Sequence, residues 1–117
     1  MISSIGQIAL TVQDLPRAVR FYRDALGLPF LFEASGMAFF NCGRVRLMLT
    51  AGEGTQGNSI LYYKTDEIQA AAGALEARGV TCEAAPRVIA KMPDHDLWMA
   101  FFRDTEGNLF ALMSEVR

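Results

Sequence analysis

An internal repeat constrains the fold of this chain more than any other feature of its sequence. The segments DLPRAVRFYRDALGL from Asp14 and DEIQAAAGALEARGV from Asp66 both open with an aspartate and reach a glycine, Gly27 or Gly79, thirteen residues later. An aspartate at the N-cap and a glycine just past the last turn are typical of α-helices. The spacing therefore predicts two equivalent helices, one in each half of the chain.

A strand with alternating apolar residues precedes each predicted helix. In QIALTV, residues 7–12, the apolar residues share one face, which we expect to lie under the first helix: Ile8, Leu10 and Val12. The same alternation in SILYYK, residues 59–64, places Tyr62 on the helix side and leaves Ser59 and Tyr63 on the open side. Both halves therefore begin with a half-buried strand.

Three further strands are expected after each helix, a short one near PFLFE or TCEAA and then a hairpin. The hairpins are AFFNCGRVRLML from Ala38 and AFFRDTEGNLFALM from Ala100, whose DTEGN segment has the composition of a β-turn. Each half is thus predicted as a βαβββ module of the α+β class, with its helix on the outer face of a cupped mixed sheet. We expect a single domain over 1–117, with modules at about 1–52 and 59–117 and a linker at 53–58.

Composition excludes several classes of partner. The chain has 117 residues, 51% apolar and 21% charged, with a net charge of −2 and a pI near 5.3. This charge is unsuited to a row of phosphates or an anionic membrane, so no nucleic acid or membrane partner is expected. Without a signal segment or a long apolar run, a cytoplasmic location is expected. Cys42 and Cys82 are interpreted as buried thiols, with a reactive nucleophile as the alternative.

The order of these elements resembles the vicinal oxygen chelate superfamily. The resemblance is carried by QIALTVQDLPRAVRFYRDALGL, its diverged repeat and FFRDTEGNLFAL, and it covers almost the whole chain. That superfamily includes glyoxalase I, extradiol dioxygenases, fosfomycin resistance enzymes and bleomycin resistance proteins. The resemblance implies paired βαβββ modules that form a cup, and a homodimer.

The resemblance also implies where a metal would be bound. Metal enzymes of this superfamily take a His or Gln from the first strand of a module and a Glu from its last strand. The matching positions here are Gln7 and Ser59 on the first strands and Ala111 and Met48 on the last, with Leu47 in place of Met48 if the register is off by one. Only Gln7 is a usual ligand type, so we expect neither a metal nor another cofactor.

The segment KMPDHDLWMAFF contains the only histidine and the only tryptophan of the chain, His95 and Trp98. His95 is a catalytic candidate, a general base that Asp94 or Asp96 would orient. The alternative is a solvated histidine in a turn capped by one of these aspartates, with Trp98 packed on the sheet.

Two arginines, Arg44 and Arg46, alternate with apolar residues and are expected on the open face with Met48. They would hold an anionic or carbonyl group of a ligand, or else pair with Glu33 or Glu53 at the rim. Apolar residues of the strands are expected to line the cup, although strand alternation should turn about half of them toward the helix. The candidates are Phe39, Phe40, Tyr63, Met99, Phe101, Leu109 and Met113.

These observations favour a protein that binds a small hydrophobic or aromatic molecule in the cup without the usual metal, as a bleomycin resistance protein does. The expected ligand-binding residues are Gln7, Arg46, Met48, Ser59, Tyr63, His95, Trp98, Ala111 and Met113. One alternative is a glyoxalase-like or dioxygenase-like enzyme that uses Gln7, His95 and an aspartate. A second alternative is a module whose role is association.

Overall fold

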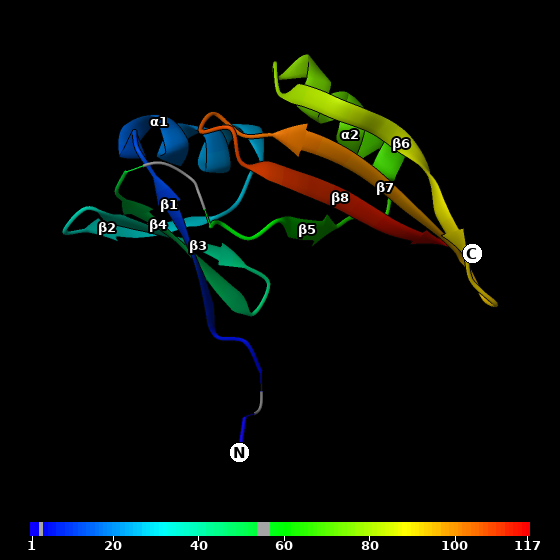
Figure 1. Ribbon diagram of the computed structural model, residues 1–117, viewed down its shortest axis with the longest axis horizontal. Helices are drawn as coiled ribbons and strands as arrows, with labels where there is room; N and C mark the ends of the chain where they lie inside the picture. The colour runs from blue at the N-terminus through cyan, green and yellow to red at the C-terminus, as the bar shows by residue number, and fades with distance from the viewer. Residues whose placement is uncertain (3, 54–56) are drawn as a thin grey trace. The chain divides into compact units, whose positions relative to one another are not determined.

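A computed structural model describes residues 1–2, 4–53 and 57–117 of the chain. The chain divides into two compact units, residues 1–59 and 60–117. Each unit contains a four-stranded mixed sheet and one helical segment, so the predicted α+β class and βαβββ order are confirmed (Figure 1). Part of the predicted linker, residues 54–56, lies outside the described residues. In the part of the chain that is described, no helix is long and apolar enough to cross a membrane.

The strands of the N-terminal unit run in the spatial order β1-β4-β3-β2. β1 is parallel to β4, whereas the other neighbours are antiparallel. The elements along the chain are β1 (Gln7–Val12), α1 (Leu15–Arg20), the π-helical turn η1 (Phe21–Ala25), β2 (Phe30–Ala34), β3 (Met37–Cys42) and β4 (Val45–Ala51).

The first helix begins and ends with the residues that its sequence predicts. Asp14 is the N-cap, and its side chain accepts a hydrogen bond of 3.1 Å from the backbone nitrogen of Arg17. The helix continues through η1, where the Leu26 nitrogen donates to the Phe21 carbonyl five residues earlier at 3.1 Å. Gly27 follows with a φ of +73°, a conformation that favours glycine at a helix C-terminus.

One face of the N-terminal sheet is buried and the other lacks a helix. Leu10 and Val12 of β1 are buried, as the alternation predicts, together with Leu47 and Leu49 of β4. Tyr22 from the helical segment is 1% exposed and packs against Phe40 with a ring separation of 6.1 Å. These contacts fix the helix over this face, and the opposite face is left for other contacts.

The register between β2 and β3 shifts at Leu31, which makes a β-bulge. Phe30 pairs with Phe40 on the helix side, and their rings meet edge to face at 5.5 Å. Phe32 pairs instead with Phe39, and these rings stack at 4.5 Å on the opposite face. The bulge therefore sends two phenylalanines of one short strand to different faces of the sheet.

The strands of the C-terminal unit run in the order β5-β8-β7-β6, with β5 parallel to β8. Its elements are β5 (Leu61–Lys64), α2 (Ile68–Ala77), β6 (Thr81–Lys91), β7 (Asp96–Arg103) and β8 (Leu109–Val116). α2 lies against one face of this sheet (Figure 1). Its buried side chains are Ile68, Ala72 and Leu75.

The expected N-cap of the second helix is wrong by one residue. Glu67, not Asp66, occupies the N-cap, and its side chain makes no capping hydrogen bond. The backbone carbonyl of Asp66 accepts a 3.5 Å hydrogen bond from the Ser114 hydroxyl, which ties this position to β8 instead. The predicted end is correct, because Gly79 follows the helix with a φ of +81°.

The expected faces of β5 are also wrong, because the two tyrosines are interchanged. Tyr63 lies on the helix side, where its ring meets Phe110 at 5.9 Å. Phe110 is 2% exposed and stacks on Phe102, so this is the core of the unit. Tyr62 lies on the opposite face, where its ring meets Phe101 at 6.1 Å. Two consecutive tyrosines have almost the same polarity, so alternation alone could not decide which one is buried.

Candidate ligand-binding face

The open face of the N-terminal sheet is defined here as the face that does not carry the helix. Strand pairing places its residues in rows that cross the strands. The first row, across β1, β4 and β3, is Gln7, Arg46 and Asn41. The second row, which also reaches β2, is Ala9, Met48, Phe39 and Phe32. The open face thus has a polar row beside an apolar one.

Arg46 joins the two rows. Its guanidinium carbon lies 5.5 Å from the centre of the Phe39 ring and 6.0 Å from that of Phe32. The two rings stack with an angle of 24° between their planes, and Phe32 is 45% exposed. A guanidinium over an aromatic face is held by the ring quadrupole while its N–H groups remain available at its edge.

The expected alternative, in which an arginine pairs with Glu33 or Glu53, is not found for Arg46 among the described residues. Glu33 pairs with Ala38 of β3, in the row that belongs to the helix side. Arg44 lies in the turn between β3 and β4 rather than on the open face, contrary to expectation. Arg46 is therefore the one charged side chain that the strands of this unit place on the open face in the described part of the chain.

Gln7 lies at the start of β1, and its side-chain nitrogen is 3.8 Å from the sulfur of Met48. Met48, not Leu47, shares the open face with Gln7, because Leu47 is 2% exposed in the core. A thioether is a weak acceptor, so this contact leaves most of the hydrogen-bonding capacity of the Gln7 amide for other groups.

The four positions that the resemblance implied for a metal carry residues that do not fit the coordination of a divalent metal ion. They supply an amide, a thioether, a hydroxyl and a methyl group, from Gln7, Met48, Ser59 and Ala111. Divalent ions in this kind of site take carboxylates and imidazoles, of which these four positions have none. Within residues 1–2, 4–53 and 57–117, no three His, Cys, Asp or Glu side chains are grouped so as to hold a metal ion.

The corresponding face of the C-terminal sheet carries Tyr62 in place of the expected Tyr63. Tyr62 pairs with Ala111 of β8, and Ala111 pairs with Phe101 of β7. Met113 belongs to the next row, opposite Met99. Ala111 is fully buried, whereas Tyr62 is 47% exposed. The sequence alone therefore did not identify Tyr62, or Phe32 in the other unit, as open-face residues. Finding Phe32 would have required predicting the β-bulge in PFLFE.

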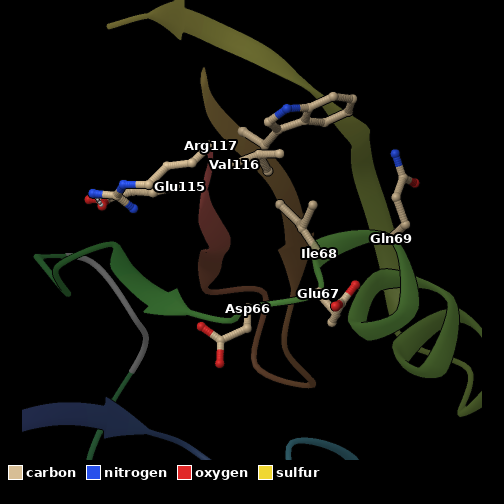
Figure 2. Close-up of a pocket in the computed structure, with 8 residues that line it drawn as sticks. Asp66, Glu67, Ile68, Gln69, Glu115, Val116 and Arg117 are labelled. Atoms are coloured by element: carbon tan, nitrogen blue, oxygen red, sulfur yellow. Dashed lines mark hydrogen bonds and ion pairs between the residues drawn. The ribbon is translucent and has the colours of Figure 1, made fainter. Parts of the chain in front are cut away.

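The structure places Trp98 away from this face. Trp98 pairs with Ser114, which is 1% exposed on the helix side of the sheet. There it lines a cavity of about 400 Å³ with Ile68 and Val116, as Figure 2 shows for the surrounding residues. Asp66, Glu67, Gln69, Glu115 and Arg117 complete the lining. Trp98, which was expected to bind a ligand in the cup, therefore lies on the helix side of the sheet and not on the open face. Ser59, another of the expected ligand-binding residues, is exposed and lies before β5 begins.

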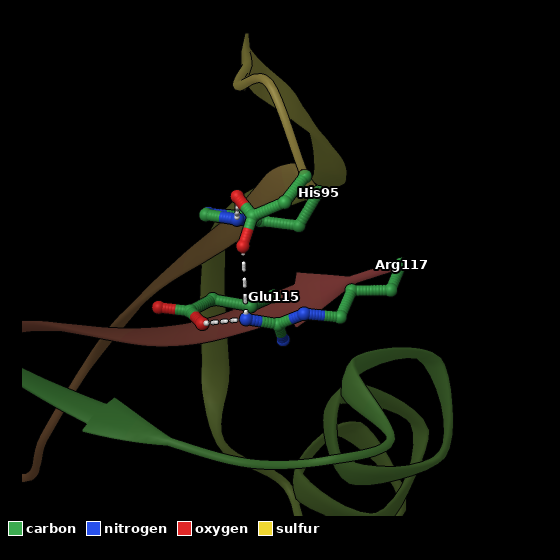
Figure 3. Close-up of polar contacts among 4 residues, drawn as sticks. His95, Glu115 and Arg117 are labelled. Carbon is green, nitrogen blue, oxygen red and sulfur yellow. Dashed lines mark hydrogen bonds and ion pairs between the residues drawn. The ribbon is translucent and has the colours of Figure 1, made fainter.

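His95 lies in the turn between β6 and β7 and is oriented by a carboxylate, as the catalytic interpretation expects. Its Nδ1 is 2.7 Å from the Asp94 carboxylate, and the Asp94 carboxylate also pairs with Arg117 at 3.3 Å (Figure 3). The hydrogen bond with His95 lowers the pKa of Asp94 below its ordinary value. The His95 side chain is only 14% exposed, so the alternative of a solvated histidine is wrong.

The second expected aspartate, Asp96, pairs with Lys91 at 3.4 Å across the β6–β7 hairpin. Neither cysteine has the surroundings of a nucleophile. Burial raises the pKa of the Cys42 thiol, and burial together with the Glu76 carboxylate raises that of Cys82. Both thiols are therefore protonated at neutral pH, which favours the structural interpretation of the two cysteines.

Comparison with known families matches residues 4–112 to the model described as Glyoxalase/Bleomycin resistance protein/Dioxygenase superfamily. The uncharacterized protein YraH of Bacillus subtilis (strain 168) is 29% identical over 126 residues, which cover 91% of this chain and 94% of YraH. The metallothiol transferase FosB of Staphylococcus haemolyticus is 34% identical over 65 residues, which cover 56% of this chain and 47% of FosB.

Among solved structures, a superfamily member from Sphaerobacter thermophilus DSM 20745 is 26% identical and aligns with a TM-score of 0.79. The alignment covers 98% of this chain and 99% of that one. The similarity therefore extends over both βαβββ units.

Proposed function

This chain belongs to the Glyoxalase/Bleomycin resistance protein/Dioxygenase superfamily, and we propose that it binds a small aromatic or hydrophobic molecule on the open face of its N-terminal sheet. The observation that carries this proposal is the stack of Phe32 on Phe39 beneath the Arg46 guanidinium. Ligand sites in proteins combine an apolar surface with a few polar groups that fix orientation.

The exposure of the aromatic residues supports the proposal. Phe32 is 45% exposed although it stacks on Phe39, so much of its surface remains available to a ligand. Aromatic pairs stabilise each other beyond the area that they bury. Met48 extends the apolar row toward β1 and can adapt its shape to an irregular ligand.

A pair of matched variants tests the proposal. The probe is 2-naphthamide, a neutral flat molecule, titrated into isotope-labelled protein while backbone resonances are recorded. We expect shifts at the open-face residues of β3 and β4, and their loss in Phe32→Ala. Phe30→Ala is the control, because Phe30 lies on the same strand but on the helix side. Shifts that are equal in both variants, or absent in the wild type, would contradict the proposal.

A second candidate function is proton transfer by His95, which the 2.7 Å contact with Asp94 favours. An ionised carboxylate at Nδ1 accepts the ring proton there, which leaves Nε2 to act as the base. In the same titration, a shift of the His95 ring resonances on adding 2-naphthamide would support this function. Unchanged ring resonances with a bound probe would favour binding alone.

The proposal includes a homodimer in the cytoplasm. Open sheet edges and the superfamily resemblance support association, and the two free thiols, Cys42 and Cys82, are compatible with a reducing compartment. The proposal does not include metallothiol transfer, the activity in FosB's name, because the donor set at the four implied positions does not fit a metal.

A further inference from the structure

We propose that the open face of the N-terminal sheet selects ligands that carry an anionic group, such as aromatic carboxylates, and that Arg46 determines this preference. The inference rests on the proposed function, since it specifies the chemical class of the molecule bound there. It is carried by the arrangement of hydrogen-bond donors in one row of the sheet and by the charge of that face.

The first row of the open face consists of hydrogen-bonding side chains with a cation at its centre. Arg46 lies opposite Gln7 of β1 and opposite Asn41 of β3. Adjacent strands are about 4.8 Å apart, so the row spans roughly 10 Å, which brings all three side chains within reach of one small polar group. All three residues are exposed.

The charge of this face is uncompensated in the part of the chain that the structure describes. The four strands of the sheet contain one acidic residue, Glu33, and its row faces the helix. Arg46 meets ring faces rather than a carboxylate. A guanidinium that is not neutralised by the protein favours an anion, and its planar edge suits the two oxygens of a carboxylate.

The neighbouring row specifies the rest of the ligand. Phe39 and Phe32 lie beside Arg46, so an anion bound at the guanidinium edge extends its body over their stacked rings. The cation–π contact also holds the arginine in place before a ligand arrives, which lowers the entropy lost on binding. The ligand that fits both rows is therefore flat and apolar with one anionic end.

Two probes of the same shape test the inference, 2-naphthoate and the neutral 2-naphthamide. Calorimetric titration of the wild-type protein at low salt should show 2-naphthoate binding about tenfold more tightly or better, as expected for hydrogen bonds to charged groups. In Arg46→Gln this ratio should fall to about one, while the affinity for 2-naphthamide changes little. Arg44→Gln is the matched control, because Arg44 lies in the adjoining turn, and it should keep the wild-type ratio.

The outcomes separate this inference from the proposed function. If both probes bind the wild type equally, the open face is a binding site without charge selection and the inference is wrong. A preference for 2-naphthoate that survives in Arg46→Gln also overturns it, since another group would then select the anion. If neither probe binds, the proposed function itself fails. Rising salt should reduce the wild-type preference and leave 2-naphthamide binding unchanged.

Discussion

The carboxamide of Asn58 pairs with the backbone of Thr11 in both directions. The Thr11 nitrogen donates to Asn58 Oδ1 at 3.0 Å, and Asn58 Nδ2 donates to the Thr11 carbonyl at 2.9 Å. These two bonds imitate the pattern by which a neighbouring strand would pair with β1, which is at the edge of its sheet. A side chain therefore protects part of an edge that would otherwise be open to association.

We predict that Asn58→Ala destabilises the protein by about 1–3 kcal/mol, because it leaves backbone groups of β1 without these partners. Chemical denaturation measures the free energy of unfolding. Asn41→Ala is the control, since Asn41 is an exposed asparagine of the same unit, and it should change stability by less than about 0.5 kcal/mol. Equal effects of the two substitutions would contradict the prediction.

A larger loss is expected for Asp104→Ala in the turn between β7 and β8. Asp104 is 7% exposed and its carboxylate accepts three hydrogen bonds, from the nitrogens of Glu106 and Asn108 and from the Asn108 side chain. Removing a buried charged acceptor with several partners should cost about 2–4 kcal/mol. Thermal unfolding with Thr105→Ala as the neighbouring control measures this, and a small shift would show that the turn is held by other contacts.

The hydrogen bond between His95 and Asp94 predicts a pH effect at acidic pH. Because this bond lowers the pKa of Asp94 in the folded protein, it stabilises the fold above the ordinary aspartate pKa near 3.9. That stabilisation is lost as the pH falls through the lowered pKa of the folded state. In His95→Ala the pKa of Asp94 should rise toward its ordinary value, measured by carbon NMR of the carboxyl group. An unchanged titration would assign the shift to Arg117 instead.

We predict a homodimer in solution. β2 is an edge strand on which Phe30 and Leu31, neither of which belongs to the proposed ligand surface, are exposed, and this is unusual for an edge that remains in water. Light scattering at micromolar concentrations should give a mass near twice the 12.9 kDa of the chain. A monomer mass over the whole concentration range would contradict the prediction.

Gln7 is predicted not to anchor a catalytic divalent metal. One amide oxygen does not offset the cost of dehydrating such an ion, and the neighbouring donor is the Met48 thioether. Elemental analysis after dialysis of untagged protein against zinc, nickel, manganese and iron should show well under one ion per chain. Stoichiometric retention that Gln7→Ala abolishes would contradict the prediction.

The sequence predicts the βαβββ order of both units because capped helices and alternating strands are local signals. Asp14 and Gly27 show this, since cap chemistry depends only on nearby backbone. The interchange of Tyr62 and Tyr63 shows the limit, because the face that a strand buries is fixed by its pairing with a distant strand. Trp98 shows the same limit, because its pairing with Ser114 of β8 decides on which side of the sheet the indole lies.

The bulge at Leu31 has a consequence for the chemistry of the open face. If Leu31 paired in regular register with β3, alternation would put Phe32 on the same side as Phe30, so the aromatic surface beneath Arg46 requires that Leu31 be left out of the pairing. A slip of β2 that brought Leu31 into the pairing opposite Phe39, with no change of residue type, would therefore move the Phe32 ring from the open face to the helix side. In this protein the aromatic character of the open face is therefore set by the register of a strand as much as by its composition.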